Sequence, residues 1–204
     1  MSIIAVPTEV ANLALSHLGQ DSEISDLDTE KSKAASAMRR FYPIAAEIAL
    51  KDFPYSFSTV TEALNLVETN PTDEWAYSYR YPTDCLKPIR IPSGIRNETR
   101  QSRIPYQVAK GTSGKLIYTD AVNAELEYIQ KVDDPSKWPS DFIMMLSYLL
   151  AAFTAPRICG EDPFKMGDKA MKMYQFFKGK TDSSDANEHQ PEEPPEAEAI
   201  RART

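Results

Sequence analysis

Imidazole and thiol groups, the side chains best suited to metal binding and covalent catalysis, are scarce in this sequence. Its 204 residues include two histidines, His17 and His189, and two cysteines, Cys85 and Cys159. A zinc site usually takes its ligands from closely spaced pairs, and a thiol nucleophile needs a histidine beside it. Neither cysteine belongs to a C-x-x-C pair or has an obvious histidine partner. The sequence therefore predicts no metal site and no thiol nucleophile.

His17 lies among apolar residues, two positions before Gly19. It could serve as a general base or a ligand. A histidine near the end of a helix more commonly bonds the last carbonyl groups of that helix. We therefore predict a structural role for His17.

Carboxylate pairs occur at residues 133–134 and 161–162. Two carboxylates can hydrolyse a glycosidic bond, but both pairs stand where turns or helix caps are expected. The stretch from Gly111 to Lys115 has two residues between its glycines, whereas a phosphate-binding loop has four. We expect no catalytic residue and no cofactor.

Charge is unevenly distributed along the chain, whose formal net charge is −7. Residues 181–204 contain seven acids and two arginines, so most of the net charge lies there. Residues 87–115 contain seven lysines and arginines against one acid, Glu98. The nearly neutral remainder argues against an extended nucleic-acid-binding surface. The basic segment is predicted to be either an interface for phosphate or an acidic partner, or a solvated surface.

Helical periodicity marks both ends of the chain. The first predicted helix starts near Pro7 with Thr8 as its cap, and Gly19 is expected to stop it. A longer helix is expected to be capped by Asp28 or Thr29 and kinked at Pro43. Its predicted buried face consists of Ala34, Ala37, Met38, Phe41, Ala45 and Ile48. Two more helices are expected after residue 139 and after residue 162.

Between the helices the apolar period changes to two, as in strands. Strands are expected at residues 60–66, 75–81, 85–91, 106–109, 115–119 and 124–132. The second carries an aromatic row that could stack on sugars or bases, although a half-buried strand explains it more simply. No connection is long enough for a crossover helix, so antiparallel pairing is predicted.

The predicted fold class is α+β: a mostly antiparallel helical bundle formed by both chain ends, with an inserted small antiparallel β module and an extended C-terminal tail. The expected parts are residues 1–57 and 136–180 for the two halves of the bundle, 58–135 for the β module, and 181–204 for an acidic, proline-rich arm.

The arm contains no aromatic residue and one large aliphatic residue, Ile200. It cannot bury enough apolar surface to offset an ordering cost of roughly 1–2 kcal/mol per residue. We expect it to become ordered only against a partner. Deleting residues 181–204 is accordingly expected to leave the stability of the body nearly unchanged.

No membrane segment is expected. The longest uncharged apolar-rich stretch, residues 142–156, is shorter than the roughly 20 residues of a spanning helix. The first seven residues lack the basic region of a signal peptide. Two cysteines are too few for a disulfide framework, which fits a reducing compartment.

A series of short stretches, in order along the chain, forms a recognisable combination. The stretches are residues 9–19 (EVANLALSHLG), 24–28 (ISDLD), 40–43 (RFYP), 53–57 (FPYSF), 75–86 (WAYSYRYPTDCL) and 89–91 (IRI). Together they resemble the tail tubular protein A family, the head-to-tail connector adaptors of short-tailed bacteriophages. The resemblance extends to about residue 178 and does not include the acidic arm.

The resemblance implies a structural virion protein without enzymatic activity. Subunits of this family form a ring of about twelve copies, a closed head-to-tail assembly, between the portal protein and the tail nozzle protein. Double-stranded DNA passes through the lumen without sequence-specific binding. The protein would be assembled in the host cytoplasm and be located in the neck of the virion.

Two other functions stay open at this stage. Some family members have been linked to degradation of cell wall or polysaccharide, so a hydrolase associated with the phage tail is one alternative. A cytosolic interaction module with a binding tail is the other. For the adaptor, the predicted contacts with the portal or a neighbouring subunit are Ile200, Arg201 and Arg203 of the arm, and Arg96, Arg100 and Arg103 of the basic segment.

Overall fold

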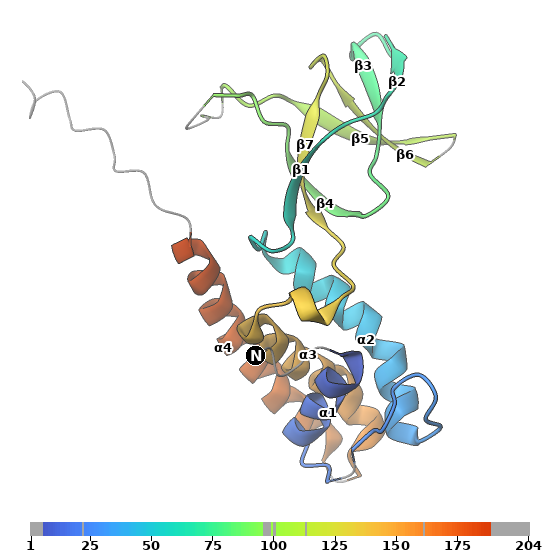
Figure 1. Cartoon of the computed structure of the whole chain (residues 1–204), viewed down its shortest axis with the longest axis vertical. Coiled ribbons are helices and arrows are strands. Elements are labelled where there is room, and N and C mark those ends of the chain that lie inside the picture. Colours follow the sequence, from blue (N-terminus) through green and yellow to red (C-terminus); the bar gives the residue numbers. More distant parts are fainter. Residues whose placement is uncertain are drawn as a thin grey trace, which may run out of the picture.

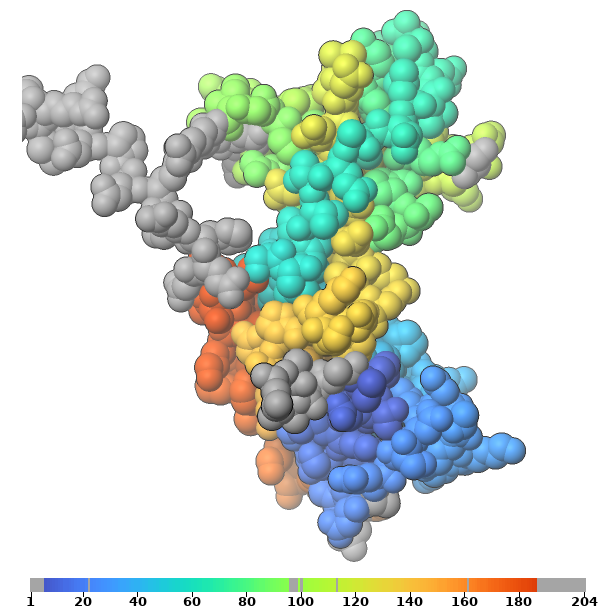
Figure 2. All heavy atoms as spheres, viewed as in Figure 1, coloured from blue at the N-terminus to red at the C-terminus, as the bar shows by residue number. Residues whose placement is uncertain are grey.

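The computed structural model describes residues 6–21, 23–95, 99, 101–112, 114–160 and 162–188. These residues form a mixed α+β structure with four α-helices and two antiparallel sheets. The helices lie at one end of the molecule and the sheets at the other (Figure 1). The two parts meet at a narrower region, which the chain crosses after the second helix and again before the third (Figure 2).

The four helices are α1 (Pro7–His17), α2 (Lys33–Asp52), α3 (Ser140–Ile158) and α4 (Pro163–Glu188). The central one is α3, which contacts each of the other three. By length and composition alone, α3 is the one helix in the described part of the chain that could cross a membrane. In this fold, buried residues along α3 belong to a core shared with the other helices.

Local hydrogen bonds and backbone conformation determine where α1 begins and ends and where α2 begins. The N-cap of α1 is Val6 and not Thr8, because the Thr8 hydroxyl instead accepts the N–H of Leu27 at 3.1 Å. After α1, Gly19 adopts φ +68°, a left-handed conformation that glycine adopts without steric cost. The prediction of Gly19 as the stop is therefore confirmed.

The predicted caps of α2, Asp28 and Thr29, are wrong. Both residues lie in a turn in which Asp26 accepts the N–H of Asp28 and the hydroxyl proton of Thr29. The helix begins after Ser32, whose hydroxyl accepts the N–H of Ala35 at 3.1 Å.

The buried face of α2 differs in part from the predicted one. The helix runs through Pro43 unbroken, and Ile48 is 39% exposed. Trp138, just before α3, stacks on Tyr42 and lines a cleft with Leu50, so α2 is covered on that side as well. Its buried residues are Ala35, Ala37, Met38, Ala45, Ala49 and Leu50.

Seven strands, residues 59–130, form the β module. One sheet has the order β1-β7-β4, and the other has the order β2-β3-β6-β5. All pairs are antiparallel, which confirms the prediction. The strands are β1 (Thr59–Ala63), β2 (Leu66–Thr69), β3 (Tyr77–Arg80), β4 (Cys85–Arg90), β5 (Tyr106–Gly111), β6 (Gly114–Thr119) and β7 (Glu125–Gln130).

The single strand predicted over residues 60–66 is wrong, because the chain changes sheets at Leu64. This side chain is buried, and its N–H donates to the carbonyl oxygen of Ala124 at 2.8 Å. The next carbonyl, that of Asn65, accepts the N–H of Arg80. β1 consequently pairs with β7, whereas β2 pairs with β3.

The helix α4 extends beyond its predicted end. Residues 181–188 are helical, so the extended arm does not begin at Thr181. Thr181 is 2% and Asp185 8% exposed, and they continue the buried stripe of Ala170 and Tyr174 at helical spacing. Polar residues form this part of the stripe, which is why apolar periodicity does not reveal it. The rest of the arm lies outside the described residues.

Candidate functional site

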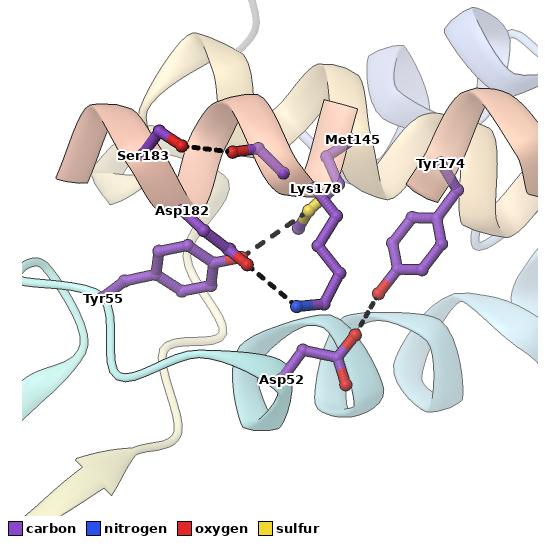
Figure 3. A network of polar contacts seen from close by, with 8 residues as sticks. Asp52, Tyr55, Met145, Tyr174, Lys178, Asp182 and Ser183 are labelled. Carbon is purple, nitrogen blue, oxygen red and sulfur yellow. Dashed lines mark hydrogen bonds and ion pairs between the residues drawn. The ribbon is translucent and has the colours of Figure 1, made fainter. Parts of the chain in front are cut away.

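A network of polar side chains joins the last turns of α4 to the chain segment between α2 and β1 (Figure 3). We call it the α4 junction. The segment, residues 53–58, is the first of the two connections between the helices and the β module. The α4 junction consists of Asp52, Tyr55, Ser56, Tyr174, Lys178, Asp182 and Asp185.

Asp182 is the centre of the network. The hydroxyl of Tyr55 donates to one of its carboxylate oxygens at 3.0 Å, and Nζ of Lys178 donates to the other at 2.9 Å. One turn further along α4, Asp185 accepts both the N–H of Ser56, at 2.9 Å, and its hydroxyl proton, at 2.7 Å. Adjacent residues of the connecting segment are thus each bound to α4.

The two tyrosines of the α4 junction are held as hydrogen-bond donors. Tyr174 donates to Asp52, in the last turn of α2. Burial, together with the neighbouring carboxylates, raises the pKa of both Tyr55 and Tyr174 well above the usual range. A phenol kept protonated and bonded to a carboxylate is a poor base or nucleophile. The geometry therefore supports a positioning role.

Two cavities flank the end of α4, and Asp185 borders both. One, of about 310 Å³, is lined by Tyr55, Phe57, Pro139, Asp141, Lys180, Thr181, Ser184 and Asp185. The other, of about 410 Å³, is lined by Phe53, Pro54, Ser56, Thr59, Ile89, Glu127, Asp185 and Ala186. The second reaches from α4 to β4 and β7, so the end of α4 lies beside the β module.

Of the six predicted partner-binding residues, the structure describes Arg103, which is exposed shortly before β5. Arg96, Arg100, Ile200, Arg201 and Arg203 lie outside the described residues.

The described residues of the basic segment lie on both sheets and do not share one environment. Arg90 of β4 pairs with Glu127 at 2.7 Å. Nζ of Lys115, in β6, lies 5.0 Å from the centre of the Tyr81 ring.

His17 has a structural environment, but its partner is not the local carbonyl group that the sequence suggests. Its Nε2 lies 2.9 Å from the hydroxyl oxygen of Ser147, in α3. Its ring stacks on Tyr148, with centroids 3.8 Å apart and planes 9° apart. Burial lowers the pKa of His17. The residue thus packs α1 against α3 as a neutral ring.

The cysteines show no sign of activation. Cys85 and Cys159 are both free and partly buried, and burial raises the pKa of each thiol. A thiol with a raised pKa is mostly protonated at neutral pH and is a weak nucleophile. In the described part of the chain, no group of three His, Cys, Asp or Glu side chains could hold a metal ion.

The carboxylate pair at residues 133–134 has structural partners. Asp133 pairs with Lys131 at 2.9 Å, and Asp134 caps the 3₁₀ helix η1 (Pro135–Lys137). The hydrogen bonds of Ser136 lower the pKa of Asp134, as expected for a cap. In the second pair, Glu161 lies outside the described residues.

A carboxylate pair that the sequence does not reveal lies in the β module. The buried hydroxyl of Tyr128 is 3.0 Å from Oε2 of Glu62 and 3.1 Å from Oδ1 of Asp84. These carboxylates line a cavity of about 370 Å³. The phenol occupies the space between them, where a glycosidase would hold its substrate. Both residues are far from Tyr128 in sequence, so no local spacing indicates the contact.

Comparison of the chain with protein-family models and with curated protein sequences finds no match. A functional assignment therefore depends on the sequence motifs and on the contacts that their residues make.

Proposed function

We propose that this protein is a non-enzymatic head-to-tail adaptor of a short-tailed bacteriophage. In this proposal about twelve copies form a closed ring that joins the portal protein to the tail nozzle protein, and the genome passes through the ring. The subunit has a helical bundle formed by both chain ends, an inserted β module, and a C-terminal arm after α4.

The observation that supports the proposal is the set of contacts that the motif residues make. In residues 9–28, the side-chain amide of Asn12 bonds both the N–H and the carbonyl oxygen of Ile24, at 2.8 and 2.9 Å. In residues 53–57, Tyr55 and Ser56 bind α4. In residues 75–86, Asp84 contacts Tyr128.

Each of these contacts joins two segments that are distant along the chain. These motif residues therefore contribute to the architecture of the subunit, which supports a structural role. That is the property expected of motifs in a structural component of a virion.

The arm and the basic segment supply the proposed partner contacts. Ile200, Arg201 and Arg203 would contact the portal or a neighbouring subunit, and the acidic part of the arm would meet Arg96, Arg100 and Arg103 of the adjacent copy. Contacts between exposed charges weaken as salt is added. Deleting residues 189–204, which leaves α4 complete, should weaken attachment to the portal, and the loss should be largest at low salt, where these contacts are least screened.

The direct test is negative-stain electron microscopy of the purified protein mixed with portal rings from the same phage. We expect an added ring of density at one end of the portal, with portal alone and protein alone as controls. Protein that stays monomeric and unbound beside intact portals would favour an interaction module. Release of soluble fragments from purified cell wall by a homogeneous preparation would favour the tail-associated hydrolase.

A further inference from the structure

The four-stranded sheet ends in two strands with unpaired edges. Its order is β2-β3-β6-β5, so within the described residues β2 pairs with β3 alone and β5 with β6 alone. An isolated bridge between Ile91 and Ile104 lies before β5 begins. The outer edge of a sheet presents backbone N–H and C=O groups to which another strand can be added.

β2 has an unusual surface for a strand at an edge. All four of its residues are exposed, including Leu66 at 54% and Val67 at 50%. A β-bulge lies at Val67, because Leu66 pairs with Tyr79 and Glu68 with the adjacent Ser78. The bulge twists the edge locally, but the strand contains neither lysine nor proline, the residues that commonly protect edges from pairing. At the other edge, Val108 of β5 is 41% exposed.

The two edges carry opposite charges. β2 contains the exposed Glu68 and is followed by a turn with the exposed Asp73 and Glu74. β5 contains the exposed Lys110 and follows the exposed Arg103. Opposite charges across a strand pair are stabilising, and like charges are destabilising. A β2 edge is therefore complementary to a β5 edge and repels a second β2 edge.

Strand direction favours the same pairing. Each neighbouring pair in the sheet is antiparallel, so β2 and β5 run in opposite directions. A second copy in the same orientation would place its β2 antiparallel to β5 of the first copy. The two edges lie on opposite sides of one sheet, so each copy keeps one edge free for the next. Such a head-to-tail contact closes into a ring or extends as a filament.

We propose that β5 of one copy pairs with β2 of the next copy, so that the four-stranded sheets of neighbouring copies join. This inference rests on the proposed ring and names the surface through which its subunits meet. The apolar side chains of Leu66, Val67 and Val108 lie within the contact. In the proposed antiparallel register Glu68 lies opposite Lys110, and Thr69 lies opposite Ala109.

Disulfide trapping in the full chain tests the pairing. In a background with Cys85→Ser and Cys159→Ser, one chain carries Thr69→Cys and a second carries Ala109→Cys, two positions that lie opposite each other in the proposed register. Oxidation of an equimolar mixture at high protein concentration should give heterodimers several-fold in excess of either homodimer. Val122→Cys, at a residue 66% exposed and outside both strands, is the matched control and should crosslink to neither. Homodimers of the Thr69→Cys chain at equal yield would overturn the pairing.

Charge exchange provides a second readout that does not depend on cysteine geometry. Glu68→Lys and Lys110→Glu should each reduce the heterodimer yield several-fold, because like charges then meet across the contact. A chain with both changes restores opposite charges in a head-to-tail contact and should recover the yield. Glu125→Lys, at an exposed position of the central strand β7, is the control and should have no effect. Failure of the double variant to recover would contradict the proposed contact.

The same crosslink, measured on portal-bound protein, separates this inference from the proposed function. Rings on the portal without a crosslink between positions 69 and 109 would overturn edge pairing and leave the adaptor function intact. A crosslink in free protein that never binds portals would support edge pairing and count against the adaptor function. Absence of the crosslink in both preparations would overturn the pairing.

Discussion

The helices and the β module are stabilised differently. The helices share a large cluster of buried apolar residues, in which α3 contributes buried side chains on most sides. The buried cluster of the β module is much smaller within the described residues, and it consists of Leu64, Tyr79, Ile91, Ile117, Ala124, Leu126 and Tyr128. Two of its largest members are tyrosines whose hydroxyl groups have polar partners: Tyr79 donates to Ala121, and Tyr128 contacts two carboxylates.

This difference has a consequence for assembly. Burial of apolar surface is the main source of stability in a domain. The helices, which have the larger buried cluster, therefore gain more stability from it. The β module depends more on strand pairing, and within the described residues both outer strands of its four-stranded sheet have an unpaired edge. A new partner at such an edge would add both backbone hydrogen bonds and apolar contact. We therefore expect the helices to provide the stable framework and the β module to gain stability on assembly.

The largest effect is expected in the helical cluster, from Phe142→Ala. Phe142 is fully buried, and its ring lies 5.3 Å from that of Tyr55, 5.0 Å from that of Phe57 and 5.4 Å from that of Trp138. Removing it leaves a cavity and should lower the free energy of unfolding by about 3–5 kcal/mol. Urea unfolding followed by circular dichroism measures this.

Ile44→Ala is the matched control, because Ile44 is 49% exposed on α2. This change should alter stability by no more than about 0.5 kcal/mol. Equal losses for the two variants would break the assignment of the main core to the helices.

The next prediction is that the unfolding of the helices and that of the β module can be measured separately. The chain has two tryptophans: Trp75 bonds Gln107 in the β module, and Trp138 is buried among the helices. Ile117→Ala, at a fully buried position of β6, should cost about 2–4 kcal/mol. The loss should appear in the fluorescence of Trp75, measured with Trp138→Phe, and be smaller for Trp138, measured with Trp75→Phe. Equal shifts of both transitions would mean that the two parts unfold as one unit.

Residue pattern predicts the elements of both parts well, because apolar periodicity reflects which side each element buries. Period two gives the strands, and turn residues such as Gly19 mark the ends of helices. The same reasoning fails at Leu64, where the alternation continues although the chain changes sheets. A hydrogen bond to Ala124, distant in sequence, causes that change, and no local pattern contains it.

The candidate site is less predictable than the fold, and the end of α4 shows why. Thr181 and Asp185 are buried but polar, so composition alone assigns them to a solvated arm. Asp185 is bound by Ser56, which precedes it by more than a hundred residues. Only the fold brings these groups together, and it gives each carboxylate a donor.

Truncation of the chain tests whether the contacts of residues 181–188 stabilise the protein. The expected change in stability is smaller than those of the two core variants. Deleting residues 181–204 removes Asp182 and Asp185 and leaves the hydroxyl of Tyr55 with only the weak acceptor Sδ of Met145, whereas deleting residues 189–204 retains both carboxylates. Hydrogen bonds to charged groups contribute about 1.5–3 kcal/mol each. The longer deletion should lower stability by about 2 kcal/mol more than the shorter one, measured by urea unfolding. Identical unfolding midpoints for the two truncations would show that the α4 junction adds no stability.

The smallest effect concerns His17, which the fold buries against Tyr148 and Ser147. Burial lowers the pKa of His17 below its ordinary value of 6.5. As pH falls below about 6.5, the unfolded chain takes up a proton at this residue that the folded chain does not, and the unfolded state is favoured. The contribution of His17 is thus fully present above pH 6.5 and is lost as pH falls toward its pKa in the folded state. The slope cannot exceed about 1.4 kcal/mol per pH unit, the value for a single proton.

Unfolding measured between pH 7.5 and about 5 checks this, since the depressed carboxylates Asp26, Glu30 and Asp134 titrate below their ordinary values of 3.8 and 4.5 and lie outside that window. His17→Asn should remove the slope, whereas His189→Asn, the control for the other histidine, should preserve it. Because His17 packs α1 on α3, the slope should appear in the transition reported by Trp138 and be weaker in that reported by Trp75. An unchanged slope in His17→Asn would assign the pH dependence to other groups. Equal slopes in the transitions of both tryptophans would show that the helices and the β module unfold as one cooperative unit.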